Sequence, residues 1–203
     1  LFPYTTLFRS ELARYDGIVS PHTHVVQYLS EINSNTKLVA NFPLIGSKFE
    51  FSEEEYLERD KIMCYTGTVY SYSNQEVILE AMSSIYDVKY EIAGYIDPNH
   101  LAELSKFECF NRVNFLGRIP WLEMQKFYHK SVLGLVIYDY KLNLGYKLGS
   151  FGTNKIFEYM EAGLPIICTD YILWKEIIDE YKCGLYVEPG NVEQIKNAIK
   201  YLI

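Results

Sequence analysis

Short apolar runs alternate with amphipathic segments from Val69 to the end of the chain, and no other feature constrains the fold as strongly. Five of these runs are typical of buried strands: 88–95, 112–117, 132–138, 165–169 and 184–189. The segments with helical periodicity are 74–85, 98–107, 121–130, 153–162, 172–181 and 192–203. Strands that are apolar on both faces and joined by helices form a parallel sheet covered on both sides. We therefore predict a doubly wound, Rossmann-like α/β domain over residues 58–203.

The stretch before this domain has a different pattern. Residues 15–21, 23–32 and 36–43 suggest a strand, a helix and a strand, whereas residues 44–57 are polar and acidic without a strong apolar period. We predict that residues 11–43 are a remnant of an N-terminal Rossmann-like domain and that residues 44–57 are a linker.

The first ten residues, LFPYTTLFRS, fit neither the strand period nor the helix period. They also lack the basic and apolar regions of a signal peptide. The same peptide results when a common sequencing-adaptor DNA is translated in frame. We interpret Leu1–Ser10 as translated adaptor and expect the natural chain to start near Glu11; the alternative is a genuine N-terminal segment.

Charge and apolar run length argue against two classes of partner. The formal net charge of −7 disfavours nucleic acid, whose binding requires a basic patch. The apolar run VLGLVIY at 132–138 is far too short to span a bilayer. We expect a cytoplasmic protein without a transmembrane segment, and any peripheral contact with the inner face of a membrane would lie in missing parts.

The cysteines of the chain show no metal-binding or disulfide pattern. They are scattered at Cys64, Cys109, Cys168 and Cys183. None belongs to a C-x-x-C pair, and no histidine stands at zinc-ligand spacing. We interpret them as reduced core residues of a cytosolic protein.

Residues that follow strands are the first candidates for a site, because ligands of open parallel sheets bind beyond the carboxyl ends of the strands. Gly67 permits a close backbone approach, and Thr68 adds a hydroxyl and an N–H. Arg118 and Ile119 follow another strand, where an arginine can pair with phosphate or stack on a base. Taken alone, each position is better explained by an ordinary turn or a solvated arginine.

The segment SFGTNKIFEYMEAG at 150–163 is the most informative. Its candidate residues are Ser150, Gly152, Thr153, Asn154, Lys155 and Glu158. Ser150 or Thr153 can cap the helix, and the N–H groups of its first turn suit a diphosphate. Lys155 and Glu158 are three residues apart and share a helix face, so one can hold phosphate and the other a ribose. The alternative is a surface Lys–Glu pair.

Other catalytic constellations are absent from the sequence. His22 and His24 in SPHTH can reach a shared ligand, although loop or cap roles are the alternative. We find no Ser/His/Asp or Cys/His set, no D-x-D metal motif, no G-x-G-x-x-G and no P-loop. We therefore predict electrostatic capture of a diphosphate without covalent catalysis, metal or cofactor.

Taken together, these segments resemble the nucleotide-binding, C-terminal half of retaining GT-B glycosyltransferases of the family 4, or group 1, type. GTVYSYSNQEVILEA resembles the opening of that half, and VNFLGRIPWLEMQKFYHKSVLGLVIY resembles the segment that follows. NKIFEYMEAGLPII is similar to the P-x-K-x-x-E-Y signature of one branch, and GLYVEPGNVEQIKNAI to the closing segment. The resemblance covers about residues 60–203. It implies that residues 11–57 are the end of the N-terminal domain and the hinge.

The resemblance implies roles for residues of the long motif. Glu158 matches the second glutamate of the family's pair and would hold the donor ribose. Lys155 matches the lysine of the branch. Ser150 stands where the first glutamate would contact the donor sugar, and Thr153 replaces the proline of the branch.

The resemblance also bears on phosphate and base recognition. TVYSYSN lacks the arginine and lysine that many members place after the turn at Gly67. Phosphate binding would then rest on Lys155, the helix N–H groups and the Gly67–Thr68 turn. Arg118 and Ile119 match the loop that meets the base.

The implied activity is transfer of a sugar from a nucleoside-diphosphate sugar to a saccharide or lipid-linked acceptor, with retention and without metal. Surface polysaccharide or glycolipid synthesis is the implied process. Most of the family's N-terminal domain and its last helices are missing, so we expect this chain alone not to turn over. The alternatives are a catalytically silent nucleotide- or partner-binding module and, less favoured, a sugar-nucleotide epimerase, which needs acid/base carboxylates and histidines at the cleft.

Overall fold

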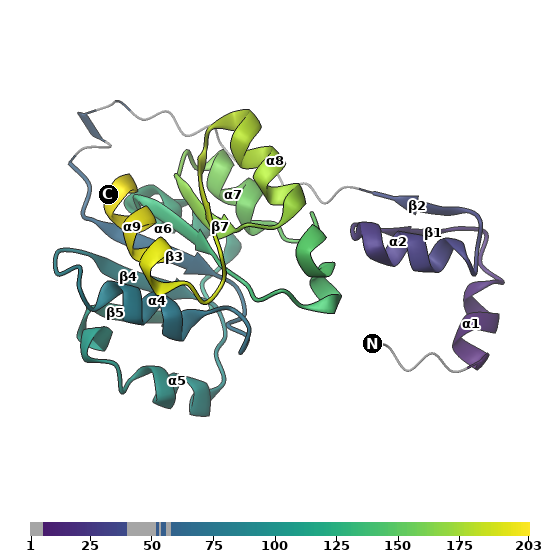
Figure 1. Cartoon of the computed structure of the whole chain (residues 1–203), viewed down its shortest axis with the longest axis horizontal. Helices are drawn as coiled ribbons and strands as arrows, with labels where there is room; N and C mark the ends of the chain where they lie inside the picture. The colour runs from purple at the N-terminus through teal and green to yellow at the C-terminus, as the bar shows by residue number, and fades with distance from the viewer. Residues whose placement is uncertain (1–5, 40–51, 53, 56–57) are drawn as a thin grey trace.

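The computed structural model describes residues 6–39, 52, 54–55 and 58–203 (Figure 1). Its main feature is a six-stranded sheet in the order β5-β4-β3-β6-β7-β8, in which every neighbouring pair is parallel. The strands are β3 Ile62–Thr66, β4 Lys89–Ala93, β5 Val113–Gly117, β6 Leu133–Val136, β7 Ile166–Thr169 and β8 Gly184–Val187. This order is that of a doubly wound sheet.

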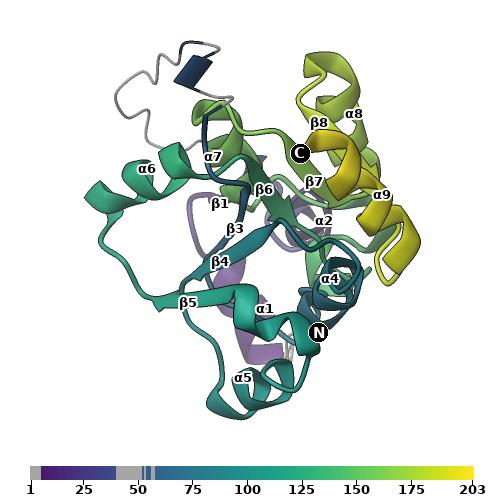
Figure 2. The same cartoon turned by 90° about the vertical axis from the view of Figure 1, so that its left-hand side faces the viewer.

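Helices cover both faces of the sheet, as predicted. They are α4 Gln75–Met82, α5 Pro98–Leu104, α6 Trp121–Lys130, α7 Lys155–Glu161, α8 Ile172–Tyr181 and α9 Val192–Leu202. Helices α4 and α9 pack together on one face, and α6 and α7 lie on the other (Figure 2). The predicted doubly wound α/β class is confirmed.

Local capping chemistry explains where two of these helices begin. Asp97 precedes α5, and its side chain accepts hydrogen bonds from the N–H groups of Asn99 and His100. Asn191 precedes α9 and accepts from the N–H of Gln194. Both residues suit this position, because a short polar side chain satisfies the free N–H groups of a first turn.

The core lies around the central strands. Every residue of β3, β6 and β7 is buried. Cys64 and Cys168 belong to these strands, and burial raises the pKa of the Cys64 thiol to about 12. All four cysteines are free thiols, in agreement with the prediction of reduced cysteines, although Cys183 is only half-buried.

The upstream segment contains the predicted strand–helix–strand unit. Strand β1 Ile18–Ser20 pairs in parallel with β2 Thr36–Leu38, and α2 Thr23–Ser30 connects them. Helix α1 Thr6–Leu12 includes part of the decapeptide interpreted as adaptor, and its Arg9 guanidinium donates to the Tyr28 hydroxyl at 3.0 Å. Residues 1–5 and most of the predicted linker 44–57 lie outside the described residues, so both interpretations stay predictions.

Three features differ from the sequence-based expectation. Strand β3 was not among the named strands, although its buried residues place it at the centre of the sheet. The interval 139–152, which lies between a predicted strand and a predicted helix, contains two short 3-10 turns, Leu142–Leu144 and Tyr146–Leu148. The helix expected over 153–162 begins only at Lys155.

Two leucines test the burial pattern with the same change of side chain. Leu135 on β6 is fully buried, whereas Leu122 on α6 is 85% exposed. We expect Leu135→Ala to lower the free energy of unfolding in urea by about 2–5 kcal/mol, because it leaves a cavity in the core. The control Leu122→Ala should change it by less than about 0.5 kcal/mol. Equal effects of the two variants would contradict the described position of β6.

Candidate functional site

A cleft of about 610 Å³ opens at the carboxyl ends of the central strands. The chain runs from β3 outward to β5 and then returns to β6 beside β3, so the loops after these two strands diverge at this edge. Every predicted site residue except Thr68 lines the cleft: Gly67, Arg118, Ile119, Ser150, Gly152, Thr153, Asn154, Lys155 and Glu158. The fold therefore brings together residues that are more than 90 positions apart in sequence.

The turn at Gly67 forms one wall of the cleft. Gly67 has a φ of 101°, a conformation that glycine adopts readily, and its N–H donates to the Ala93 carbonyl at 2.8 Å. A Cβ at Gly67 would lie 2.9 Å from Lys155 Nζ. The absence of a side chain thus lets the ammonium of Lys155 rest against the turn.

Lys155 lies over two buried aromatic rings. Its Nζ is 5.3 Å from the ring centroid of Tyr65 and 5.8 Å from that of Tyr138. Ring faces carry partial negative charge and attract such a cation. Lys155 takes part in none of the ion pairs found within the described residues. Its charge is therefore directed at the cleft without compensation by a carboxylate.

Glu158 is held in place by a tyrosine from α6. The Tyr128 hydroxyl donates to Glu158 Oε2 at 2.8 Å and lies 3.2 Å from Thr66 Oγ1. Burial, and then the charge of Glu158, raise the pKa of Tyr128 well above its ordinary value. The hydroxyl therefore stays protonated as a donor, and it orients a half-buried carboxylate that lines the cleft. Lys155 and Glu158 share a helix face, as predicted.

Ser150 has a different role from the predicted cap. Asn154, and neither Ser150 nor Thr153, occupies the N-cap position of α7, and its side chain forms no capping hydrogen bond, so the expectation for Ser150 or Thr153 was wrong. Ser150 is instead buried, and its hydroxyl accepts the N–H of Gly152 at 3.0 Å. Its carbonyl accepts the indole N–H of Trp174 at 2.9 Å. These two bonds fix the loop before α7, and the first of them engages the Ser150 hydroxyl within the loop.

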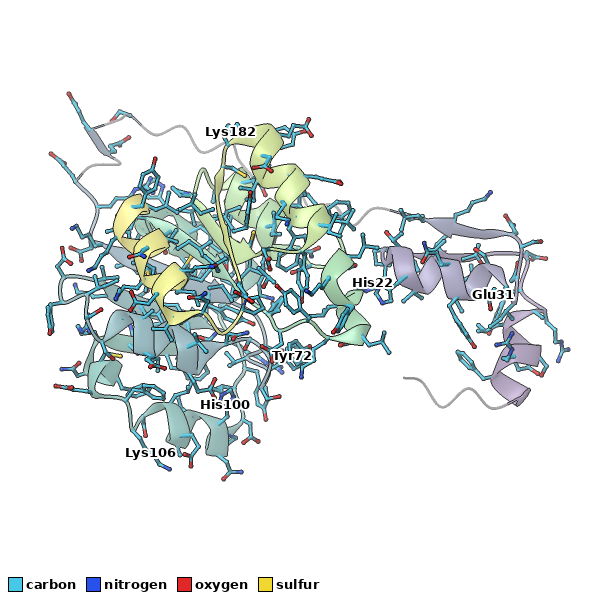
Figure 3. All side chains as sticks on the ribbon, in the orientation of Figure 1. His22, Glu31, Tyr72, His100, Lys106 and Lys182 are labelled. Atoms are coloured by element: carbon cyan, nitrogen blue, oxygen red, sulfur yellow. The ribbon has the colours of Figure 1, made fainter. Side chains whose placement is uncertain are left out.

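The upstream segment meets this loop through His22. The ring atom Nδ1 of His22 lies 2.6 Å from Ser150 Oγ, and a Cβ on Gly152 would lie only 2.0 Å from Cε1 of the same ring. His22 lines the cleft, and the His24 ring centroid is 5.7 Å away. Figure 3 shows His22 at the end of the upstream segment that faces the larger domain. A shared ligand for the two histidines stays a prediction.

Arg118 and Thr68 lie at different distances from the cleft. Arg118 is exposed at the rim, and its guanidinium carbon is 5.9 Å from the ring centroid of Tyr95. Thr68 does not line the cleft; its carbonyl accepts the Tyr65 hydroxyl at 2.8 Å. Thr68 therefore supports the turn from behind in this structure.

Sequence reasoning missed the aromatic residues that line the cleft. The missed lining includes Tyr70, Tyr72, Trp121, Tyr138 and Trp174. The alternation in TVYSYSN was a usable signal, because two aromatic residues follow the glycine turn at which a ligand was expected. Tyr128 gave no local signal, since it meets Glu158 only through the fold.

Two further searches concern metals and membranes. Across residues 6–39, 52, 54–55 and 58–203, no group of three or more His, Cys, Asp or Glu side chains is arranged to hold a metal ion. A metal-independent reaction stays a prediction. None of the helices described here combines the length and apolar character needed to cross a bilayer.

A parallel, doubly wound sheet with a cleft at the point where its strand order reverses defines the class of Rossmann-like ligand-binding domains. The sequence pattern of the family described as Glycosyl transferases group 1 matches residues 47–203, which is more than half of the chain. The chain belongs to this family, and it carries the C-terminal half of the GT-B fold. No curated protein sequence matches it.

Several solved structures share the fold at low sequence identity. HepE from Anabaena, in complex with UDP and glucose, is 13% identical with a TM-score of 0.72, over 98% of this chain and 57% of HepE. A TarM variant from S. aureus, in complex with fondaparinux, alpha-GlcNAc-glycerol and UDP, is 15% identical with a TM-score of 0.69, over 97% of this chain and 38% of TarM. The C-terminal domain of LpcC from Francisella tularensis is 18% identical with a TM-score of 0.54, over 79% of this chain and 84% of that domain. The chain thus spans only part of HepE and TarM.

The contact of His22 with Ser150 should depend on pH. Burial lowers the pKa of His22 from its ordinary 6.5, and His24 is lowered by burial and by the charge of His22. A histidine whose pKa is lower in the folded chain than in the unfolded chain stabilises the fold fully at pH values above its ordinary pKa of 6.5. This stabilisation is lost as the pH falls through the lower pKa of the folded chain. An NMR titration of the histidine ring protons should give a midpoint below 6.5 for His22.

The His22→Gln variant assigns the His22 signal in this titration, because it removes that signal alone. Replacement should also raise the midpoint of His24, since a neighbouring positive charge is removed. A His22 midpoint at or above 6.5 would show that the ring is not buried against the loop.

Proposed function

We propose that this cleft binds the nucleoside-diphosphate sugar of a glycosyltransferase, with UDP as the nucleotide. The observation that carries the proposal is the convergence of Lys155, the Gly67 turn and Glu158 on one cleft. A cation that pairs with no carboxylate of the described residues, a glycine turn without a side chain and an oriented carboxylate match a diphosphate and a ribose. Family membership supports this reading, and HepE and TarM are relatives in fold whose structures hold UDP.

The proposed donor position follows the walls of the cleft. The diphosphate lies against Lys155, the Gly67–Thr68 turn and the start of α7, which includes Thr153 and Asn154. The ribose hydroxyls donate to Glu158, whose orientation by Tyr128 leaves the second carboxylate oxygen for the ligand. The loop of Arg118 and Ile119, at the opposite rim, meets the base. The sugar then lies near Ser150 and Gly152.

The proposed chemistry is transfer with retention and without metal. Negative charge develops on the leaving diphosphate in the transition state, and a donor or cation placed there beforehand lowers the barrier. Lys155 is suited to this role because its ammonium is held over Tyr65 and Tyr138. Further residues that handle the acceptor would belong to the N-terminal half, which this chain spans only in part.

We propose a cytoplasmic enzyme of surface polysaccharide or glycolipid synthesis, with a saccharide or lipid-linked saccharide as acceptor. The TarM structure that shares this fold holds a glycerol-linked GlcNAc, and the HepE structure holds glucose. The proposed domain division places residues 11–43 in the N-terminal half, 44–57 in the hinge and 58–203 in the donor-binding half. We also propose that the chain alone does not turn over, because it spans 38% to 57% of these relatives.

One observation favours a second candidate, a silent nucleotide-binding module. Ser150 is buried and engaged with His22, Gly152 and Trp174, so a catalytic contact to a donor sugar would have to compete with these bonds. A folded chain that binds no nucleoside diphosphate would favour a partner-binding module. A chain that binds UDP but never transfers sugar when the complete protein is assayed would favour the silent nucleotide-binding module.

Removal of the Glu158 carboxylate should weaken nucleotide binding. We expect Glu158→Ala to cost about 1–3 kcal/mol in UDP affinity, because a hydrogen-bonded charged acceptor is lost. Calorimetric titration of the whole chain with UDP measures this, and UMP should lose a similar factor since it carries the same ribose. Glu180→Ala, an exposed carboxylate on α8, is the matched control and should leave the affinity unchanged.

Removal of the Lys155 charge should act on the diphosphate specifically. We expect Lys155→Met to reduce UDP affinity by about 1–3 kcal/mol and UMP affinity by less, because charge-assisted hydrogen bonds to the diphosphate are lost. Lys175→Met is the matched control, since Lys175 also lies over an aromatic ring, Tyr186, but outside the cleft. Equal losses for UDP and UMP would place the diphosphate elsewhere.

A further inference from the structure

Tyr70 and Tyr72 form an aromatic platform at the mouth of the cleft. Their ring centroids are 4.9 Å apart, and the ring planes differ by only 6°. Both residues line the cleft, and Tyr70 is 47% exposed. One face of the Tyr70 ring is therefore covered by the Tyr72 ring, and the opposite face of Tyr70 is open to a ligand.

The platform is fixed from below and from behind. The Tyr70 carbonyl accepts both the N–H of Ser73 at 3.0 Å and its hydroxyl at 2.6 Å, which closes the turn that carries the two rings. The Tyr72 ring meets the buried Tyr138 edge-on at 5.9 Å, and Asn143 binds the Tyr72 side chain. A ligand that stacks on Tyr70 thus finds the surface already ordered, which reduces the entropy cost of binding.

The platform is also free of charge. The segment TVYSYSN contains no acidic or basic side chain, although it follows directly on the turn that contacts Lys155. A flat, uncharged, hydroxyl-bearing aromatic surface does not attract phosphate. It suits a ring that presents C–H groups on one face and hydroxyls at its edge, because aromatic faces carry partial negative charge.

We propose that Tyr70, supported by Tyr72, stacks on the pyranose ring of the acceptor. This inference rests on the proposed donor function of the same cleft. The acceptor ring is favoured over the donor's own sugar by position. Lys155 lies over Tyr138, Tyr138 meets Tyr72 edge-on, and Tyr72 stacks on Tyr70. These rings therefore lie between the ammonium of Lys155, where the diphosphate is proposed to bind, and the open face of Tyr70.

The test is saturation-transfer difference NMR on the whole chain in the presence of UDP. The probe is methyl β-D-glucopyranoside, with glycerol as the acyclic comparison, and irradiation is applied to the aromatic protons. We expect transfer to the ring C–H protons of the glycoside that share one face, and little transfer to glycerol. Tyr70→Leu should weaken glycoside binding about three- to tenfold, as loss of an aromatic contact does, whereas Tyr70→Phe should retain it.

Matched measurements separate the two proposals. Tyr86→Leu is the control, because Tyr86 is 83% exposed and lies outside the cleft. A chain that binds UDP but shows no Tyr70-dependent transfer to the glycoside overturns the platform and leaves the donor site intact. A chain that shows this transfer but binds no UDP supports the platform and overturns the donor proposal.

Titration with UDP and UDP-glucose decides which pyranose the platform holds. For an acceptor platform, Tyr70→Leu should leave the affinities for both nucleotides unchanged. If Tyr70→Leu weakens UDP-glucose but not UDP, the stacked ring belongs to the donor, and the acceptor assignment is overturned. Circular dichroism of each variant confirms that the fold is retained.

Discussion

The return of the chain from β5 to a position beside β3 is the constraint on which the site depends. This crossover makes β3 and β6 neighbours while their following loops lead to opposite faces of the sheet, so a cleft opens between them. The turn at Gly67 enters the cleft from one half, and the helix that begins at Lys155 enters from the other. Burial of all residues in β3, β6 and β7 keeps this edge in one arrangement.

Burial also sets the electrostatic character of the cleft. Lys155 has its charge above two buried rings, whereas Glu158 has its carboxylate fixed by the Tyr128 hydroxyl. In a partly dry environment, hydrogen bonds and cation–ring contacts are stronger than in water, and a charge without a partner raises the free energy of the fold. The two side chains therefore match the ligand proposed above, which would bring a negative diphosphate to Lys155 and hydroxyl donors to Glu158.

The loop before α7 joins the two parts of the chain. Ser150 binds the N–H of Gly152 within its own loop and approaches His22, which is 128 residues earlier in the sequence. The close approach of His22 to Gly152 requires that this position have no side chain. The same loop thus lines the cleft and receives the upstream segment.

Patterns along the chain were enough to predict the fold class, most element positions and the face shared by Lys155 and Glu158. These properties follow from the period of apolar residues, from continuous apolar runs and from helix caps such as Asp97. All three depend on residues that are close together in the sequence. The tertiary structure alone decided that Tyr128 orients Glu158 and that Ser150 binds His22 instead of capping a helix. Those contacts join residues 30 and 128 positions apart, and such distances are bridged only when the crossover and the packed core bring the segments together.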